Sequence, residues 1–340
     1  MRDSSTVSSA STPRGGFSIV RDHGPKTSGP ARPIAYAAFT FILGLAFIRP
    51  FVDLIGYAVQ TDLYSHILLI PFISAYLIFI QRAQLPKDYR TSLGWALILS
   101  FCGLLTLISV WISLKIDPPV SQNDYLSLTT FSFICLLLSG GFLFLGGKWM
   151  AAAAFPLGFL VFMVPLPDRA LHFLETASQV ASTEAAAIFF SITGTPMLRD
   201  GFVFQLRGIA IQVAQECSGI RSSWVLFITT LAASYLFLKS PCKRAILIAF
   251  VIPLAIVRNG FRIWVIGILC VEIGPHMIDS AIHHQGGPIF FVLSLIPLFL
   301  LLWWLRRGER TAAPGILQVN TVGRDRNGAS ALPPDPMIPR

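Results

Sequence analysis

Charged residues are scarce in this sequence. They make up 13% of its 340 residues, whereas about 25% is usual in soluble proteins. Hydrophobic residues make up 54%. A soluble globule could not bury that much apolar surface, and so apolar a composition also excludes intrinsic disorder and collagen. The composition therefore predicts a membrane protein.

Cysteine and metal-ligand clusters are also sparse. Five cysteines in a chain of this length exclude a disulfide-stapled mini-protein. Cys102 and Cys135 lie inside apolar stretches, where a free thiol acts as a small hydrophobic group. The pair His283 and His284 has no acidic residue or cysteine nearby at ligand spacing. We therefore expect neither a metal ion nor a cofactor.

Long apolar runs divide the chain into a membrane domain and two tails. Residues 1–32, rich in Ser, Thr, Pro and Gly, predict a disordered tail, and 306–340 predict a second one. The first apolar run starts too late for a signal peptide. A span needs roughly 20 apolar residues, so residues 33–305 predict an α-helical polytopic membrane protein with about eight transmembrane helices. The expected spans are 33–57, 64–80, 93–114, 126–145, 149–163, 222–238, 245–271 and 287–305.

Residues 165–220 interrupt this series of spans. Pro165 and Pro167 end the fifth span, and apolar residues then recur at helical spacing with polar residues between them. This pattern predicts an amphipathic or re-entrant helix rather than another span. Apolar and polar residues alternate over 201–213, which predicts short strands with a turn at Gly208. We expect this insertion to lie on the outer face of the membrane.

The positions of basic residues predict the orientation. The chain has a formal net charge of +9, and much of the positive charge lies in the tails and short loops, so no nucleic-acid partner is expected. With eight spans, both tails and the loops with most of the basic residues fall on one side, which the positive-inside rule assigns to the cytoplasm. A further span at 171–191 would place Arg306, Arg307 and Arg310 outside. The basic loop residues are Arg82, Lys87, Arg90, Lys148, Lys239, Lys243 and Arg244.

Three polar features then fall at a similar depth on the outer side. Cys217 lies at the outer end of the sixth span, Arg258 and Arg262 lie within the seventh, and His283 and His284 precede the eighth. An arginine within a span is costly and is functional by default, although Arg262 snorkelling to the outer headgroups is the alternative. Adjacent histidines point apart on a helix, which favours one of them as an acid/base.

The surroundings of Cys217 favour a reactive thiol. Arg221 lies nearby, and Ser218 or Ser222 could cap a helix that starts here. A helix N-terminus and a nearby cation both favour the thiolate. A disulfide between Cys217 and Cys270 is the competing interpretation in an oxidising compartment.

Together these groups indicate acyl transfer. A thiolate attacks a carbonyl carbon, an imidazole takes and returns protons, and a cation stabilises the oxyanion. Such Cys–His arrangements recur on unrelated folds because geometry defines them, not their order in the chain.

Three motifs in order resemble the exosortase/archaeosortase family. They are ECSGIRSS at 216–223, N-x-x-R-I from Asn259 to Ile263, and H-x-x-x-G followed by Phe, formed by His283, Gly287 and Phe291. The resemblance covers about residues 40–305. It implies a membrane-embedded cysteine protease or transpeptidase of the bacterial inner membrane that cleaves C-terminal sorting signals of exported proteins. Such a signal comprises a short motif, an apolar span and a basic cluster, and the subtype for VPDSG-type signals is the closest.

Residue by residue, the resemblance assigns three catalytic roles. Cys217 matches the nucleophile, Arg262 the essential arginine, and His283 the third member. His284 stays a rival, because Pro288 stands where many relatives have Trp. The expected partners are signal-bearing exported proteins and membrane lipids, and hydrolysis and transfer to an amine or lipid acceptor both stay open. The supporting residues are Ser218, Gly219, Arg221, Asn259 and Arg258.

Two functions without peptidase chemistry remain alternatives. One is a transporter or scaffold for exported polysaccharide or protein, with its arginines along an anionic pathway. It predicts that Cys217→Ala is silent, and the lack of an evident inverted repeat weighs against it. The other is a binding partner of an export machine, which would tolerate substitution of Cys217, Arg262 and His283 alike.

Overall fold

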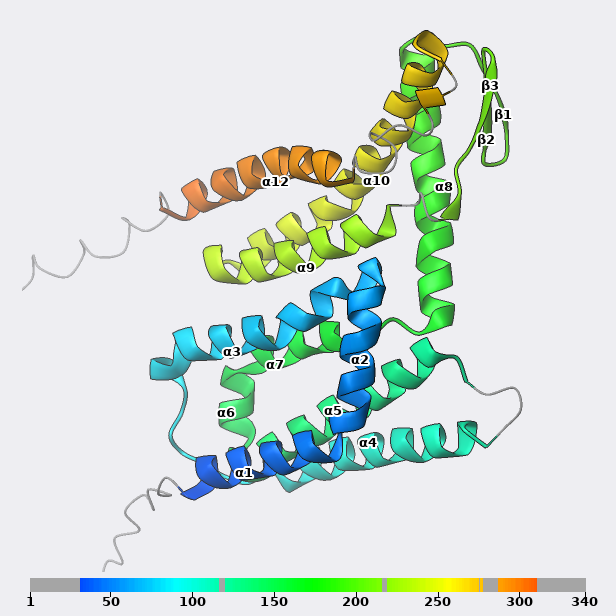
Figure 1. Ribbon diagram of the computed structural model, residues 1–340. Coiled ribbons are helices and arrows are strands. Elements are labelled where there is room, and N and C mark those ends of the chain that lie inside the picture. Colours follow the sequence, from blue (N-terminus) through cyan, green and yellow to red (C-terminus); the bar gives the residue numbers. More distant parts are fainter. Residues whose placement is uncertain (1–30, 116–119, 216–218, 275, 278–286, 311–340) are drawn as a thin grey trace, which may run out of the picture.

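The computed structural model describes residues 31–115, 120–215, 219–274, 276–277 and 287–310, and most of these residues are helical (Figure 1). Three short 3-10 helices, η1 (Asp62–Leu69), η2 (Arg82–Gln84) and η3 (Leu160–Met163), extend or join α-helices. The α-helices are α1 (Ala31–Ala46), α2 (Ile48–Gln60), α3 (Ile70–Gln81), α4 (Leu93–Ser113), α5 (Gln122–Phe144), α6 (Gly147–Ala152), α7 (Ala154–Phe159), α8 (Asp168–Ile192), α9 (Ile220–Phe237), α10 (Pro241–Glu272) and α12 (Gly287–Arg310).

The helices have the length and apolar character of membrane spans. Within the described ranges, six helical segments can each cross a membrane, and two bent helix pairs raise the number to eight if each pair forms one span. The prediction of an α-helical polytopic membrane protein with about eight spans is therefore confirmed. Figure 1 shows α1, α3, α4, α5, α9 and α12 running in similar or opposite directions, with α2 and α8 across them.

The first bent pair is α1 and α2, which meet at an angle of 68° where the sequence predicts one straight span. Pro50 lies in the first turn of α2 and has no N–H to donate. Its ring also clashes with the carbonyl group four residues earlier, which belongs to Ala46, the last residue of α1. The break therefore falls at Phe47.

Pro156 breaks the predicted fifth span in the same way. The residue four positions before it, Ala152, is the last residue of α6, and Pro156 lies in the first turn of α7. Residues 149–163 accordingly form α6, α7 and η3 instead of one straight helix. The α7–η3 segment then bends by 89° into α8, which is the predicted amphipathic helix.

Three short antiparallel strands follow α8. They are β1 (Met197–Asp200), β2 (Val203–Leu206) and β3 (Ile209–Gln212), in the order β1-β2-β3. Gly208, with a φ of 85°, forms the turn between β2 and β3, as the sequence predicts. The sequence pattern missed β1, because Arg199 and Asp200 interrupt the apolar alternation there.

The sheet packs against the C-terminal halves of α8 and α10. Phe204 of β2, Phe190 of α8 and Ile263 and Ile266 of α10 belong to one buried apolar cluster. A side chain at Gly267 of α10 would place its Cβ 2.5 Å from the Phe190 ring. The absence of a side chain there lets α8 and α10 come close together.

An aromatic and polar contact joins α9 to the first half of the chain. The rings of Tyr235 on α9 and Phe155 on α7 stack with their centroids 3.8 Å apart. The Tyr235 hydroxyl also donates a hydrogen bond of 2.8 Å to Oε1 of Gln81, at the end of α3. These contacts fix α9 against both earlier helices.

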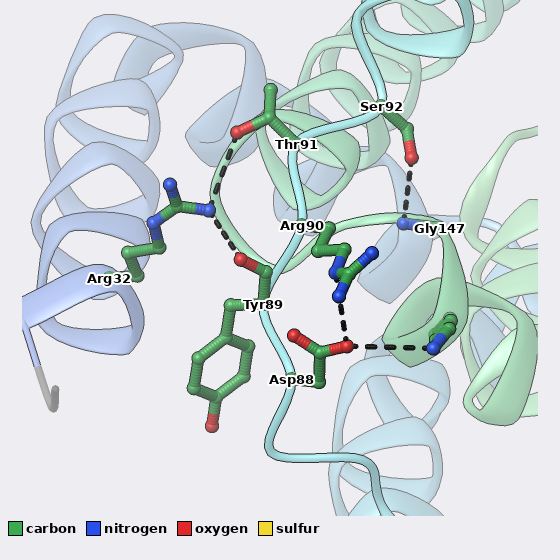
Figure 2. Close-up of polar contacts among 8 residues, drawn as sticks. Arg32, Asp88, Tyr89, Arg90, Thr91, Ser92 and Gly147 are labelled. Atoms are coloured by element: carbon green, nitrogen blue, oxygen red, sulfur yellow. Dashed lines mark hydrogen bonds and ion pairs between the residues drawn. The ribbon is translucent and has the colours of Figure 1, made fainter. Parts of the chain in front are cut away.

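Basic residues meet at the end of the bundle where α1 begins. Arg32 donates to the backbone carbonyl group of Tyr89 at 2.5 Å, and Asp88 pairs with Arg90 at 3.3 Å and Lys148 at 3.5 Å (Figure 2). The beginning of α1 and the end of α12 lie on this same side of the bundle (Figure 1). The structure thus brings together loops that the charge pattern places on one side, and their assignment to the cytoplasm stays a prediction.

Glu309 of α12 closes the turn between α9 and α10 at this end. Its carboxylate accepts hydrogen bonds from the backbone N–H groups of Lys239 at 3.1 Å and Ser240 at 2.8 Å. We expect Glu309→Ala to lower the free energy of unfolding by about 1 kcal/mol, as the loss of a helix cap does. Denaturation in detergent measures this. Glu272→Ala, at an exposed position of α10, is the matched control and should leave stability unchanged.

Candidate functional site

The predicted catalytic residues lie partly outside the described residues. Cys217 and Ser218 fall there, as do both candidate histidines, His283 and His284. The structure describes Arg262, the other supporting residues, and the chain on both sides of residues 216–218. We therefore build the candidate site from these described neighbours.

Gly219 forms the junction between the predicted nucleophile segment and α9. It has a φ of 73°, in the left-handed region that favours glycine. A Cβ at this position would lie 2.6 Å from Oδ1 of Asn259, which is 2% exposed. Both its backbone conformation and its neighbour therefore require glycine here.

The first turn of α9 is held at the Gly219 carbonyl group. The Ser223 hydroxyl donates to this oxygen at 2.8 Å and the Ser222 hydroxyl at 3.2 Å. Of the two residues that could cap this helix, Ser222 does not do so, and Ser218 lies outside the described residues. The position of Ser222 inside the first turn brings its hydroxyl to the carbonyl group three residues earlier instead. No described side chain caps α9.

Arg258 on α10 reaches the same junction. Its Nη2 donates to Oγ of Ser223 at 2.9 Å and to the Gly219 carbonyl group at 3.4 Å. The Arg258 residue is 7% exposed, and its Nη1 has no hydrogen-bond partner among the described residues. Arg262, one helical turn further along α10, is partly buried. Arg258 directly precedes the motif of residues 259–263, which we call the α10 motif. The start of α9 is thus in direct contact with α10 next to this motif.

The segment that leads to residue 216 is held from the other side by α8. Gln179 donates to the Val213 carbonyl group at 2.5 Å, and the Gln215 side-chain amide donates to Nδ1 of His172 at 3.1 Å and to Oγ1 of Thr176 at 3.4 Å. These three α8 residues are spaced four and three positions apart, so they lie on one helix face. The sequence does not single them out, because polar residues on an amphipathic helix usually face water.

Close packing sets α10 against α8 beside the site. A Cβ at Gly260 would lie 2.5 Å from Cβ of Ala185 and 3.0 Å from the backbone of α8. Gly260 directly follows Asn259 and precedes Arg262 by two residues. The α8–α10 crossing therefore determines where the residues of the motif point.

The competing disulfide is not formed. Cys270 is a free thiol, 2% exposed within the apolar cluster beneath the sheet. The competing interpretation, a bond between Cys217 and Cys270, therefore does not hold, because Cys270 faces the core between α10 and the strands.

The charges that the structure places at the junction are positive. Arg258 is buried beside the first turn of α9, where the helix macrodipole is also positive. Arg221 is in this first turn with an exposed side chain. In the part of the chain that the structure describes, no three His, Cys, Asp or Glu side chains are grouped to hold a metal ion. The arrangement suits an anion, or a reaction that develops negative charge.

Comparison with known protein families identifies the family of this chain. The family model of the transmembrane exosortases matches residues 58–300, which include the Gly219 junction, the α10 motif and the predicted histidine segment. No curated protein and no solved structure matches the chain.

Proposed function

Since this chain belongs to the transmembrane exosortase family, we propose that it is a cysteine peptidase or transpeptidase that removes C-terminal sorting signals from exported proteins. The contact that carries the proposal is the one between Arg258 and the Gly219 junction. It brings the α10 motif with Arg262 to the helix that starts three residues after Cys217. The chemistry needs a thiol, a cation and a base. Cys217, Arg262 and His283 offer these groups, and all three lie within the residues that the family model matches.

In the proposed reaction the Cys217 thiolate attacks the carbonyl carbon of the scissile peptide bond. A C–S bond forms, and Arg262 stabilises the oxyanion of the tetrahedral intermediate. The C–N bond then breaks, and His283 gives a proton to the leaving amine. The fragment with the substrate's span and basic tail leaves, and the rest of the substrate stays attached as a thioester.

A second nucleophile completes the cycle. Water or an amine attacks the thioester carbonyl carbon and gives a proton to His283, the C–S bond breaks, and the thiolate is restored. Water yields a carboxylic acid, and an amine yields a new amide. This order needs no oxidant, reductant or metal.

We place the protein in the bacterial inner membrane, with both tails in the cytoplasm and the Gly219 junction on the outer side. The basic residues gathered at the opposite end of the bundle support this orientation. A substrate with its apolar span in the bilayer and its basic cluster in the cytoplasm would then present its short motif at the outer surface, where Cys217 is expected.

A processing assay in native membranes tests the proposal. A reporter with a VPDSG-type motif, an apolar span and a basic tail is co-expressed with the wild type or a variant, and insertion is checked by blot. Cys217→Ala should insert and leave the reporter whole, while Cys242→Ala, which removes an exposed thiol elsewhere, should cleave it normally. Arg262→Ala and His283→Ala should also leave it whole.

Two results of this assay would redirect the assignment. If Cys217→Ala cleaves the reporter like the wild type, thiol chemistry is excluded, and a transporter or scaffold of an export system becomes the better explanation. If His284→Ala is inactive and His283→Ala is active, the base is His284.

A further inference from the structure

Arg258 is a buried cation for which the described residues provide no carboxylate. The ion pairs that the structure shows involve Asp88 and Glu184, and both lie elsewhere. The residue is only 7% exposed, and both of its described acceptors are uncharged oxygens bound to Nη2. An uncompensated charge in such a place is strongly unfavourable, which indicates that an anion joins it in the working protein.

The unused Nη1 lies beside a second anion-binding feature. Nη2 of the same guanidinium binds the Gly219 carbonyl group and Ser223, in the first turn of α9. This helix has 18 residues, and no described side chain caps its first N–H groups. The first backbone N–H groups of a helix and the positive end of its dipole favour an anion at this end. A buried guanidinium whose Nη1 has no described partner thus meets a helix start that no described side chain caps.

We propose that Nη1 of Arg258 and the first turn of α9 bind a carboxylate of the substrate peptide, from an acidic side chain near the bond that is cleaved. This inference rests on the proposed function, because only a substrate that reaches Cys217 comes within a few residues of Gly219. The site therefore selects substrates by their charge.

This role differs from that of Arg262 in the step it affects. A carboxylate is charged both before and during the reaction, so its contact with Arg258 stabilises the ground state and the transition state alike. The oxyanion at Arg262 develops only as the carbonyl group is attacked. Loss of Arg258 should therefore mainly raise KM, and loss of Arg262 should mainly lower kcat.

The test compares two reporters in proteoliposomes containing the full-length protein. The first is a reporter that the wild type cleaves, with its cut site located by mass spectrometry. The second carries Asn or Gln in place of every Asp and Glu within about five residues of the cut, a distance within reach of an extended peptide. Wild-type kcat/KM should fall about 10- to 100-fold on the second reporter, the range for a lost charge-assisted hydrogen bond.

The Arg258→Gln variant should show the same fall on the first reporter and almost no further fall on the second. Arg258→Lys, which keeps the charge, should retain part of the preference for the acidic reporter and serves if Arg258→Gln does not insert. Arg207→Gln, which removes an exposed arginine from the turn between β2 and β3, is the control and should leave the preference in place.

Four results would overturn the inference. If Arg258→Gln loses the same factor in kcat/KM on both reporters, Arg258 has only a structural role. Efficient Arg258-dependent cleavage of a reporter without an acidic residue near the cut would exclude carboxylate recognition. A loss that follows the fraction of anionic lipid instead of reporter charge would assign the site to a headgroup. If Glu216→Gln reproduces the Arg258→Gln pattern, the anion is internal. Cleavage of both reporters by Cys217→Ala would instead refute the proposed function itself.

Discussion

Gly219→Ala is expected to insert into the membrane and yet to lose about 100-fold or more in cleavage rate. The left-handed conformation costs an alanine about 1–2 kcal/mol, and its Cβ would lie 2.6 Å from the buried Asn259 amide. Overpacking of this kind typically adds about 1–3 kcal/mol. Because Gly219 is two residues from Cys217, a shift of about 1 Å at the junction can cost two orders of magnitude in rate.

The chain provides a matched control for the backbone part of this effect. Gly208 also has a positive φ, of 85°, but a Cβ there would meet nothing within 4 Å. Gly208→Ala should therefore lose only about 1–2 kcal/mol of stability and keep its cleavage rate. Both variants are measured by denaturation in detergent and by the reporter assay. The loss shared by both reports the backbone strain, and the additional loss of Gly219→Ala reports the steric contact with Asn259.

A second substitution tests the contact itself. Asn259→Ala removes the amide that a Cβ at residue 219 would meet, so the double variant should be more stable than the sum of the two single losses predicts. Additive losses would show that the amide does not restrict residue 219. Cleavage by Gly219→Ala at the wild-type rate would show that the junction does not position the nucleophile.

The sequence predicts the spans well because length and apolar character decide them. The sequence predicts two straight spans where the structure has bends. The hydropathy averaged over some 20 residues is hardly changed by one proline. Pro50 and Pro156 each stand four residues after the last residue of a helix, and that spacing could have located both breaks. The amphipathic helix was recognised from its periodicity, although its angle to its neighbours depends on packing.

The candidate site was harder to predict from the sequence than the spans. Its motif residues carry their own signal, since an arginine in an apolar helix is conspicuous. The three α8 residues His172, Thr176 and Gln179 carry no such signal, because polar residues on an amphipathic helix usually face water. Their role in holding residues 213–215 follows only from the structure, in which the strands bring this segment back to α8. Likewise, nothing in the sequence shows that Arg258 contacts the start of α9.

Gly260→Leu is expected to lower the free energy of unfolding strongly. A Cβ at residue 260 already lies 2.5 Å from Ala185 Cβ and 3.0 Å from the α8 backbone, and a backbone cannot turn aside as a flexible side chain can. The helices must separate, so the free energy of unfolding should fall by about 3 kcal/mol or more, the upper part of the range for overpacking. Gly260→Ala should lose less, because it adds only the Cβ, and about 1 kcal/mol of helix propensity gained over glycine offsets part of its strain.

The same separation moves the α10 motif away from the Gly219 junction. Arg258 and Arg262 flank Gly260 on α10, so cleavage should fall with stability even at temperatures where the variant stays folded. Gly44→Leu is the control, since a Cβ at Gly44 of α1 meets nothing within 4 Å and the substitution should leave both stability and cleavage intact. Normal cleavage by a stable Gly260→Leu protein would contradict the view that the α8–α10 crossing positions the site.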